Sequence, residues 1–442
     1  MNRIATLNRH SFTKKTCLFF VAVFYALLCF SCATDSKNIE VQKQNDFEQI
    51  DLENQEAEKL QKEKEERKRL FYQTHFADGS PIYTTENLWN DKDSILLLFA
   101  GDIMAHAPNW SFGKYENIYA DIAPIVKEAD LSFANLETPV DKNVPYSTYP
   151  NFNVHSAYAQ ATFDAGFCVF SLANNHTNDQ GRDGIIETRN YFSEVRESTK
   201  DSERPIYSAG LKEKSGGDLT YEVIEKNGWK ILFVAFTELL NSPTASSWID
   251  YIPPTKERRE SLIKELVKLR KENPCDLFVV SIHTSEPEYV FEITEKQKNF
   301  YYDLLESSAD VIWCNHPHVS KKWEVVNIQG KAKKIIFYDM GNTISAQRTN
   351  PQFKNPETLR DYTGDGYMAR VRFVKNQGET QIVFVDPILL TTYITPENQY
   401  VIKILNDNFL SELKSQENHK WADYLFERKK LMEKIKGTTT WQ

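Results

Sequence analysis

Short hydrophobic runs recur along the middle of the chain, and each has the length of a single β-strand. They include Ile95–Ala100, Phe167–Leu172, Ile231–Phe236, Leu277–Ile282, Ile335–Tyr338 and Ile382–Val385. Segments with helical spacing separate them, and the apolar positions of two such segments are Leu262, Leu266 and Leu269, then Phe300, Leu304 and Leu305. Strands that alternate with helices predict an α/β fold between about residues 94 and 387.

The N-terminal 32 residues have a different pattern, that of an export signal. Basic residues come first, the stretch Cys17–Phe30 is almost purely apolar, and Ser31 and Cys32 follow. The apolar stretch is short for a membrane span, and this layout is typical of a secretory signal. Cys32 is placed like the lipid-accepting cysteine of bacterial lipoproteins. We expect a membrane-anchored lipoprotein of the cell envelope, with ordinary cleavage or an uncleaved anchor helix as alternatives.

Two further segments flank the α/β region. Residues 33–75 are dense in Glu, Lys, Gln and Asn, which predicts a charged, partly helical tether that cannot form a core. Residues 76–395 are the expected catalytic-type domain. Residues 396–442 have helical spacing and predict a C-terminal helical extension, with apolar positions Ile402, Leu405, Phe409, Leu410, Leu413, Trp421, Leu425, Phe426 and Leu431.

Charge and cysteine content exclude two classes of protein. The net charge of −9 argues against a nucleic-acid partner, which would require a basic surface. After the signal, Cys168, Cys275 and Cys314 are widely spaced and include no CxxC pair. A disulfide framework is therefore not predicted.

Residue types that bind metals come just after five strand-like runs, which are Ile95–Ala100, Leu131–Ala134, Phe167–Leu172, Leu277–Ile282 and Val311–Trp313. These residues are Asp102, Glu137, Asn175 with His176, His283, and His316 with His318. The carboxyl ends of strands in an open α/β sheet meet at one edge, where ligands bind. We therefore expect one metal centre with hydrolytic chemistry. Its mixed oxygen and nitrogen ligands favour Mn, Fe or Zn.

Each of these motifs has a simpler explanation when it is taken alone. Asp102 could cap a following helix, and Glu137 could form a structural salt bridge. A histidine beside asparagines could belong to an ordinary turn. His106, four residues past Asp102, is left undecided between the same edge and local structure.

Together the motifs resemble the CapA family of capsule or poly-γ-glutamate synthesis proteins, which share the calcineurin-like metallophosphatase fold. The matching stretches are Ala100–Met104, Ala134–Pro139, Leu172–His176 with Asp179 and Gly181, Ala309–Val311 with His316–Val319, and Met340–Asn342. The resemblance covers about residues 94–387. It implies a β-sandwich flanked by helices, with metal ligands at the strand ends.

The resemblance also implies roles for individual residues. The metal ligands would be Asp102, Glu137, Asn175, His283, His316 and His318, which would hold one or two divalent ions. His176 would assist proton transfer beside Asp102 at the catalytic centre. We further expect the residues lining the substrate site to be Asn174, Asp179, Glu288 and Asn342. Three departures from the family pattern are Met104 in place of a histidine, Thr284-Ser285, and Cys314-Asn315.

Two classes of function remain open at this point. The first is an envelope-anchored, metal-dependent hydrolase or transferase of capsule or poly-γ-glutamate type synthesis. The second is a non-catalytic subunit that binds the polymer or partner enzymes in a membrane synthesis complex. A secreted nucleotidase would share the fold. The expected partners are an envelope polymer or capsule-synthesis proteins, with the membrane reached through Cys32 or an N-terminal anchor.

Overall fold

The structure is a computed structural model that describes residues 93–328, 331–376, 378–435 and 438–441, together with Gln55, Lys59 and Lys62. The chain divides into two units, residues 1–70 and residues 71–442. The predicted signal, the lipidation of Cys32 and nearly all of the predicted tether lie outside the described residues. The three described positions of the tether are helical and exposed.

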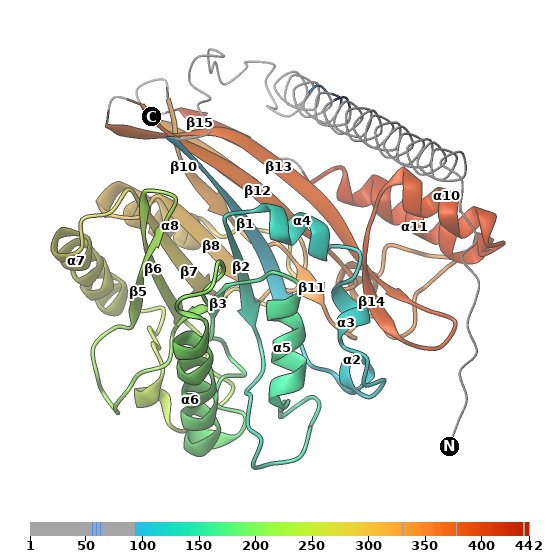
Figure 1. The fold of residues 1–442 in the computed structure, drawn as a ribbon, viewed down its shortest axis with the longest axis horizontal. Coiled ribbons are helices and arrows are strands. Elements are labelled where there is room, and N and C mark those ends of the chain that lie inside the picture. The colour runs from blue at the N-terminus through green and yellow to red at the C-terminus, as the bar shows by residue number, and fades with distance from the viewer. Residues whose placement is uncertain are drawn as a thin grey trace, which may run out of the picture. The chain divides into compact units, whose positions relative to one another are not determined.

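Two β-sheets form the centre of the second unit (Figure 1). The larger sheet has the strand order β14-β13-β12-β1-β2-β3-β4, and β11 pairs with β1. The smaller sheet has the order β15-β9-β10-β8-β7-β6-β5. The strands are β1 (Ser94–Ile103), β2 (Leu131–Leu136), β3 (Val169–Ser171), β4 (Tyr207–Ala209), β5 (Tyr221–Lys226), β6 (Trp229–Thr237), β7 (Leu277–His283), β8 (Val311–Asn315), β9 (Trp323–Ile328), β10 (Lys331–Phe337), β11 (Asn342–Ile344), β12 (Asp365–Asn376), β13 (Glu379–Ile394), β14 (Tyr400–Ile404) and β15 (Thr438–Trp441).

Aromatic side chains fill the space between the two sheets. Phe99 of β1 stacks on Phe133 of β2 with ring centroids 4.7 Å apart, and both rings contact Trp313 of β8. The indole nitrogen of Trp313 donates a hydrogen bond to the carbonyl of Ala100 at 2.9 Å, which links the sheets directly. Burial of such large apolar rings is the main stabilising contribution to this core. The predicted β-sandwich is confirmed.

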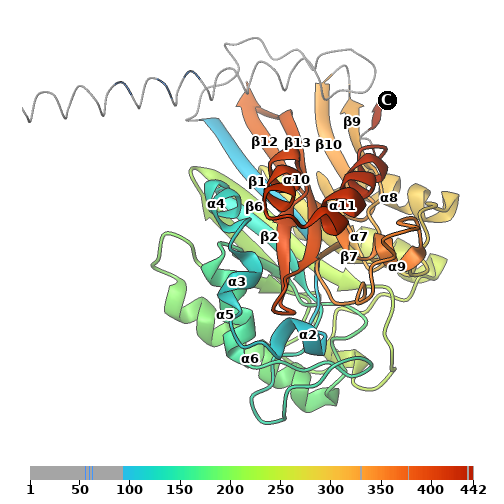
Figure 2. The ribbon, with the colours of Figure 1, turned by 90° about the vertical axis from the view of Figure 1, so that its right-hand side faces the viewer.

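Helices cover the outer faces of both sheets (Figures 1 and 2). On the larger sheet, Phe170 of β3 contacts Phe163 and Phe192, which belong to α5 and α6. The predicted apolar faces of α7 and α8 are buried against the smaller sheet. The helices are α2 (Ala107–Trp110), α3 (Glu116–Tyr119), α4 (Ala123–Glu128), α5 (Ser156–Asp164), α6 (Gly181–Thr199), the 3-10 helix η3 (Ser246–Trp248), α7 (Lys256–Glu272), α8 (Glu295–Ser307), α9 (Leu359–Tyr362), α10 (Asp407–Ser415) and α11 (His419–Met432). Among the helical residues that the structure describes, none forms a segment long and apolar enough to span a membrane.

Parallel pairing brings the ends of the site-bearing strands together. β1, β2 and β3 are parallel neighbours in the larger sheet, with Asp102 opposite Asn135. β7 and β8 are parallel neighbours in the smaller sheet, with His283 opposite Asn315. Their carboxyl ends therefore present polar residues at a common edge of each sheet.

The C-terminal segment differs from the expectation at Ile402 in β14, at Leu405, which precedes α10, and at β15 (Thr438–Trp441), which pairs with β9. Helices α10 and α11 pack on β13 and β14 through a separate apolar cluster, so the helical extension is confirmed. Ile402, however, lies in β14, which pairs with β13 and extends the larger sheet beyond residue 395. The expected helix at Ile402 is wrong because a short apolar run has no periodicity that separates a strand from a helix.

A buried ion cluster ties α11 to the larger sheet. Asp365 of β12 accepts hydrogen bonds from Arg348 at 2.7 Å and from Arg428 of α11 at 2.6 Å. Burial by itself would raise the pKa of Asp365, but the two guanidinium groups outweigh it and lower the pKa below its ordinary value. Since the folded protein binds this proton more weakly than the unfolded chain, the cluster stabilises the fold above about pH 4 and is lost at lower pH.

We expect Asp365→Asn to destabilise the protein by about 3–5 kcal/mol, because it leaves two buried cations without their carboxylate. Urea unfolding at pH 7 measures the loss. Asp423→Asn, on the exposed side of α11, is the matched control and should change the free energy of unfolding by less than about 0.5 kcal/mol. Equal effects of the two substitutions would contradict a stabilising role for the cluster.

Candidate metal centre

Asp102 lies at the end of β1, where the backbone passes very close to the start of β11. A Cβ atom on Gly101 would overlap the carbonyl oxygen of Gly341, so only glycine permits this approach. The backbone N–H of Asp102 donates to that carbonyl at 3.1 Å. Its side chain is fully buried and accepts a hydrogen bond from Asn135 at 2.8 Å. The second carboxylate oxygen lies 3.1 Å from Nδ1 of His318.

Glu137 follows β2, and its surroundings are those of a metal-binding carboxylate. Its side chain is fully buried, and neither carboxylate oxygen has a hydrogen-bond partner among the described residues. Oε1 lies 3.8 Å from Nε2 of His283 and 3.8 Å from Nε2 of His318. Burial, reinforced by Asp102, raises the pKa of Glu137 well above its ordinary value. A carboxylate buried without donors is costly, and a bound metal ion removes that cost.

Three buried histidines face Glu137 from the smaller sheet. His283 ends β7, and the loop after β8 carries His316 and His318. Both loop histidines have positive φ, 112° and 57°, a backbone region that non-glycine residues rarely adopt. Nδ1 of His316 has no hydrogen-bond partner in the described part of the chain. Burial and then neighbouring histidines lower the pKa of His283 and His316, which keeps both neutral, as metal ligands must be.

The donor atoms form two overlapping groups. One consists of Glu137, His316 and His318, the other of Asp102, Glu137 and His283, and within each group the atoms lie within 4.8 Å of one another. Two donors that share one ion at about 2.1 Å lie roughly 3 to 4 Å apart. Asn175, after β3, adds its carbonyl oxygen 2.7 Å from Nε2 of His283. All six predicted ligands converge, and their chemistry fits a divalent cation. That they bind one remains a prediction.

His176 lies beside this cluster and is held by a carboxylate. Its Nδ1 is 2.7 Å from Oδ2 of Asp179, which also accepts a hydrogen bond from the backbone of Phe152 at 2.8 Å. The amide of Asn241 lies 3.2 Å from the same ring nitrogen, and Phe152 packs edge-on against the ring. With Nδ1 occupied, Nε2 is the nitrogen left for exchange of a proton.

A cavity of about 740 Å³ opens beside His318 and His176. His176 and His318 line it, together with Met104, His106, Tyr149, Glu288, Tyr289, Ala346, Gln347, Thr349, Asn350, Gln352, Thr358 and Arg360. Such a volume is that of an ordinary small-molecule site. Of the six candidate ligands, His318 is the one that lines this cavity, so the cavity reaches the candidate metal cluster at His318.

Three of the four residues expected to line the substrate site do not line this cavity; only Glu288 does. Asn174 donates to the carbonyl of Leu136 at 2.9 Å and so fastens its own loop. Asp179 orients His176, and Asn342 accepts from Nδ1 of His318 at 3.0 Å. These three short side chains bond to neighbouring parts of the site, and their place beside a substrate stays a prediction.

Sequence reasoning missed several residues of the site. Asn135 lies 2.8 Å from Asp102 and 3.4 Å from His283, and its position two residues before Glu137 could have indicated it. Asn241 lies in a loop and Arg360 in the short helix α9, and neither carries a sequence pattern that predicts its place. His106, left undecided, lines the cavity. Burial and then nearby His318 lower the pKa of His106 to about 3, so it is neutral.

Comparisons with known proteins agree with this geometry. Residues 96–347 match the family described as bacterial capsule synthesis protein PGA_cap. The chain is 26% identical over 281 residues to the capsule biosynthesis protein CapA of Bacillus anthracis, covering 58% of this chain and 61% of that protein. It is 25% identical over 270 residues to the PGA biosynthesis protein CapA of Bacillus subtilis, covering 58% and 64%. A solved calcineurin-like phosphoesterase, YfkN from Bacillus subtilis, aligns with a TM-score of 0.36 and 12% identity over 75% of this chain and 99% of that one. The chain thus spans less than two thirds of the length of either curated relative.

Proposed function

The chain belongs to the bacterial capsule synthesis protein family, and from that premise we propose that it is a metal-dependent hydrolase or transferase acting in the synthesis of a capsule or envelope polymer. The observation that supports this most is the buried Glu137 carboxylate, which has no hydrogen-bond donor among the described residues and faces three imidazoles. A site of this kind beside an open cavity is built for a cation and a substrate together.

The residues around the cluster have separate tasks in this proposal. A divalent cation held by Asp102, Glu137, Asn175, His283, His316 and His318 would act as a Lewis acid on the bond that breaks. Asp179 fixes the ring of His176 through Nδ1, so that Nε2 can pass a proton to the leaving group. Asn135 holds Asp102 and His283 in place. Such partners of ligands orient them and tune their affinity.

Arg360 supports an anionic substrate. It is the single cation among the residues lining the cavity, and its guanidinium donates to the hydroxyl of Tyr289 at 3.2 Å. Guanidinium groups match phosphate and carboxylate oxygens in geometry. The arrangement favours a phosphoryl or carboxylate group in the cavity, within the wider class of phosphoryl, amide and ester bonds.

We expect Arg360→Gln to raise the KM for bis(p-nitrophenyl) phosphate about ten-fold and to change kcat little, because a lost charged hydrogen bond of about 1.5 kcal/mol weakens binding uniformly. Steady-state kinetics with added Mn²⁺ measures both constants. Arg182→Gln, an exposed arginine on α6, is the control. A loss confined to kcat would contradict the binding role.

The proposed activity itself is tested with the full chain and a panel of chromogenic substrates. Mn²⁺, Zn²⁺ or Fe²⁺ should give hydrolysis of at least one phosphoester, ester or amide, and chelation should abolish it. If no metal confers turnover on any class of bond, the enzymatic proposal fails.

A non-catalytic, polymer-binding role is the second candidate, and Met104 favours it. Met104 is buried at the cavity, where metallophosphatases carry a second histidine ligand, and a thioether is a poor ligand for a hard ion. In this case the protein would bind metal and polymer but show no turnover.

We also propose that the protein is anchored in the cell envelope through a lipid on Cys32 and works beside capsule-synthesis proteins. The order of basic, apolar and small residues before Cys32 supports it. Radiolabelled palmitate should label the wild-type chain in cells and not Cys32→Ser. Equal labelling of the two would refute lipidation at this cysteine.

A further inference from the structure

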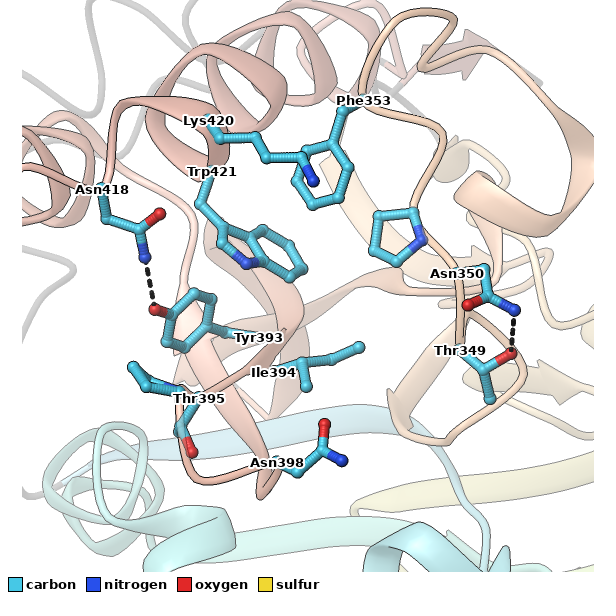
Figure 3. Close-up of a pocket in the computed structure, with 12 residues that line it drawn as sticks. Thr349, Asn350, Phe353, Tyr393, Ile394, Thr395, Asn398, Asn418, Lys420 and Trp421 are labelled. Carbon is cyan, nitrogen blue, oxygen red and sulfur yellow. Dashed lines mark hydrogen bonds between the residues drawn. The ribbon is translucent and has the colours of Figure 1, made fainter.

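A second cleft of about 590 Å³ lies between the C-terminal helices and the edge of the larger sheet (Figure 3). Its floor and walls come from the loop at residues 349–353, the end of β13 with the turn after it, and the start of α11. The lining residues are Thr349, Asn350, Pro351, Phe353, Tyr393, Ile394, Thr395, Pro396, Asn398, Asn418, Lys420 and Trp421.

This cleft adjoins the cavity lined by His176 and His318, which we call the metal cavity. Thr349 and Asn350 are exposed and line both. A chain-like substrate with one unit at the metal cluster can therefore continue across these two residues into the cleft. The cleft lies entirely beyond residue 347, where the family match ends. It is thus a feature in which this chain can differ from its relatives.

The lining combines apolar surfaces with amide groups whose hydrogen-bond donors or acceptors are available to a ligand. The indole of Trp421 borders the middle of the cleft, with Ile394 below it and Phe353 at its edge (Figure 3). The amide of Asn398 makes no hydrogen bond within the described part of the chain. Asn418 uses its nitrogen on the hydroxyl of Tyr393 at 2.9 Å, which leaves its carbonyl oxygen available. Amides both donate and accept, which suits ligands whose hydroxyl groups do the same.

The charges of the cleft favour a polymer without a repeated negative charge. No carboxylate lines it, and Lys420 is its single cation. The ammonium group of Lys420 already lies 3.9 Å over the ring of Phe353. A polymer with a carboxylate on every unit would place several negative charges in a cleft that has one cation. The protein's net charge of −9 would add to the repulsion. Apolar ring surfaces beside amides and hydroxyls instead match sugar rings, whose C–H faces are apolar and whose edges carry hydroxyls.

We propose that this cleft is a binding subsite for the sugar units of a polysaccharide chain whose neighbouring unit occupies the metal cavity. The position of the reacting unit rests on the proposed function. The cleft itself contains none of the six candidate metal ligands, so its binding of sugar does not depend on the ion.

Titration calorimetry on the full chain tests the subsite, with cellohexaose, maltohexaose and chitohexaose as probes and hexaglutamate as the contrasting polymer. The expected result is saturable binding of at least one hexasaccharide, equal in EDTA and in Mn²⁺. Asn398→Asp should weaken it about ten-fold, since the substitution removes a hydrogen-bond donor and adds a charge that must be desolvated. Aspartate tolerates the positive φ of 70° at this position.

Two further variants separate binding from folding. Asn355→Asp makes the same change at an exposed asparagine of the adjoining loop, outside the cleft, and should bind like wild type. Trp421→Phe keeps an aromatic ring in the core while removing part of the apolar wall, and should weaken binding with the chain still folded by circular dichroism.

The outcomes distinguish this inference from the proposed function. Failure of all three sugars to bind, equal effects of Asn398→Asp and Asn355→Asp, or binding of hexaglutamate in place of the sugars would overturn the subsite. Sugar binding in EDTA by a protein that hydrolyses no chromogenic substrate would support the subsite and remove the enzymatic proposal alone.

Discussion

Glu137→Gln and His318→Ala are each expected to deprive the protein of its metal ion. Both side chains are buried and belong to the groups whose donor atoms lie within 4.8 Å of one another. Loss of a partner that only orients a ligand weakens metal binding about 10–100-fold. A direct ligand should therefore cost at least about 100-fold. Elemental analysis after dialysis, together with Mn²⁺ and Zn²⁺ titrations, measures the change.

The control for this experiment is His419→Ala, at the exposed start of α11 and outside both cavities. It should retain the wild-type metal content. Glu137→Gln also tests the site through the free energy of unfolding. If Glu137 binds no ion, the substitution removes an uncompensated buried charge and raises the free energy of unfolding while metal content stays unchanged. That combination would contradict the metal centre.

His176→Ala is expected to lower kcat by about 10²–10⁴-fold and to leave metal content unchanged, since a positioned acid or base contributes that much. His176 lines the cavity but belongs to neither candidate ligand group. The measurement is kcat on the best chromogenic substrate, paired with elemental analysis. Loss of metal together with activity would show that His176 acts as a ligand instead.

Asp179→Asn tests the positioning of that histidine. The substitution keeps the size of the side chain but replaces the carboxylate 2.7 Å from Nδ1. It should lower kcat less than His176→Ala does and leave KM nearly unchanged, because an amide can still contact Nδ1 but holds the ring less firmly than the carboxylate does. His155→Ala, whose ring bonds the carbonyl of Val144 outside the cavity, is the control. A wild-type kcat in Asp179→Asn, or a change confined to KM, would contradict the positioning role.

The strands and the site-bearing loops could be predicted because their signal is local. Each predicted strand run lies within or across an observed strand, and the residues just past them line up through parallel pairing. The resemblance to the capsule-synthesis family, drawn from the same short motifs, is confirmed by the match over residues 96–347.

Prediction from the sequence failed, or left a residue's role open, where contacts between distant segments decide what a side chain does. The spacing of apolar residues around Ile402 predicted a helix. In the structure this segment instead pairs with the edge of β13 as strand β14. Asn174 follows a strand exactly as Asn175 does, but its amide bonds to Leu136 while that of Asn175 faces His283. The two residues are neighbours in the chain, but their side chains point to different partners. The spacing of residues in the sequence does not predict this difference.

By itself the sequence determined the alternation of strands and helices, the six candidate ligands and the family, because hydrophobic period and short motifs are properties of adjacent residues. Only the tertiary structure decided that Glu137 lacks a donor within the described part of the chain and that Asp179 holds His176. It also decided that a cleft formed by α11 and the loop after Arg348 adjoins the cavity lined by His176 and His318. These are distances between segments far apart in the chain, and packing of the two sheets and the C-terminal helices sets them.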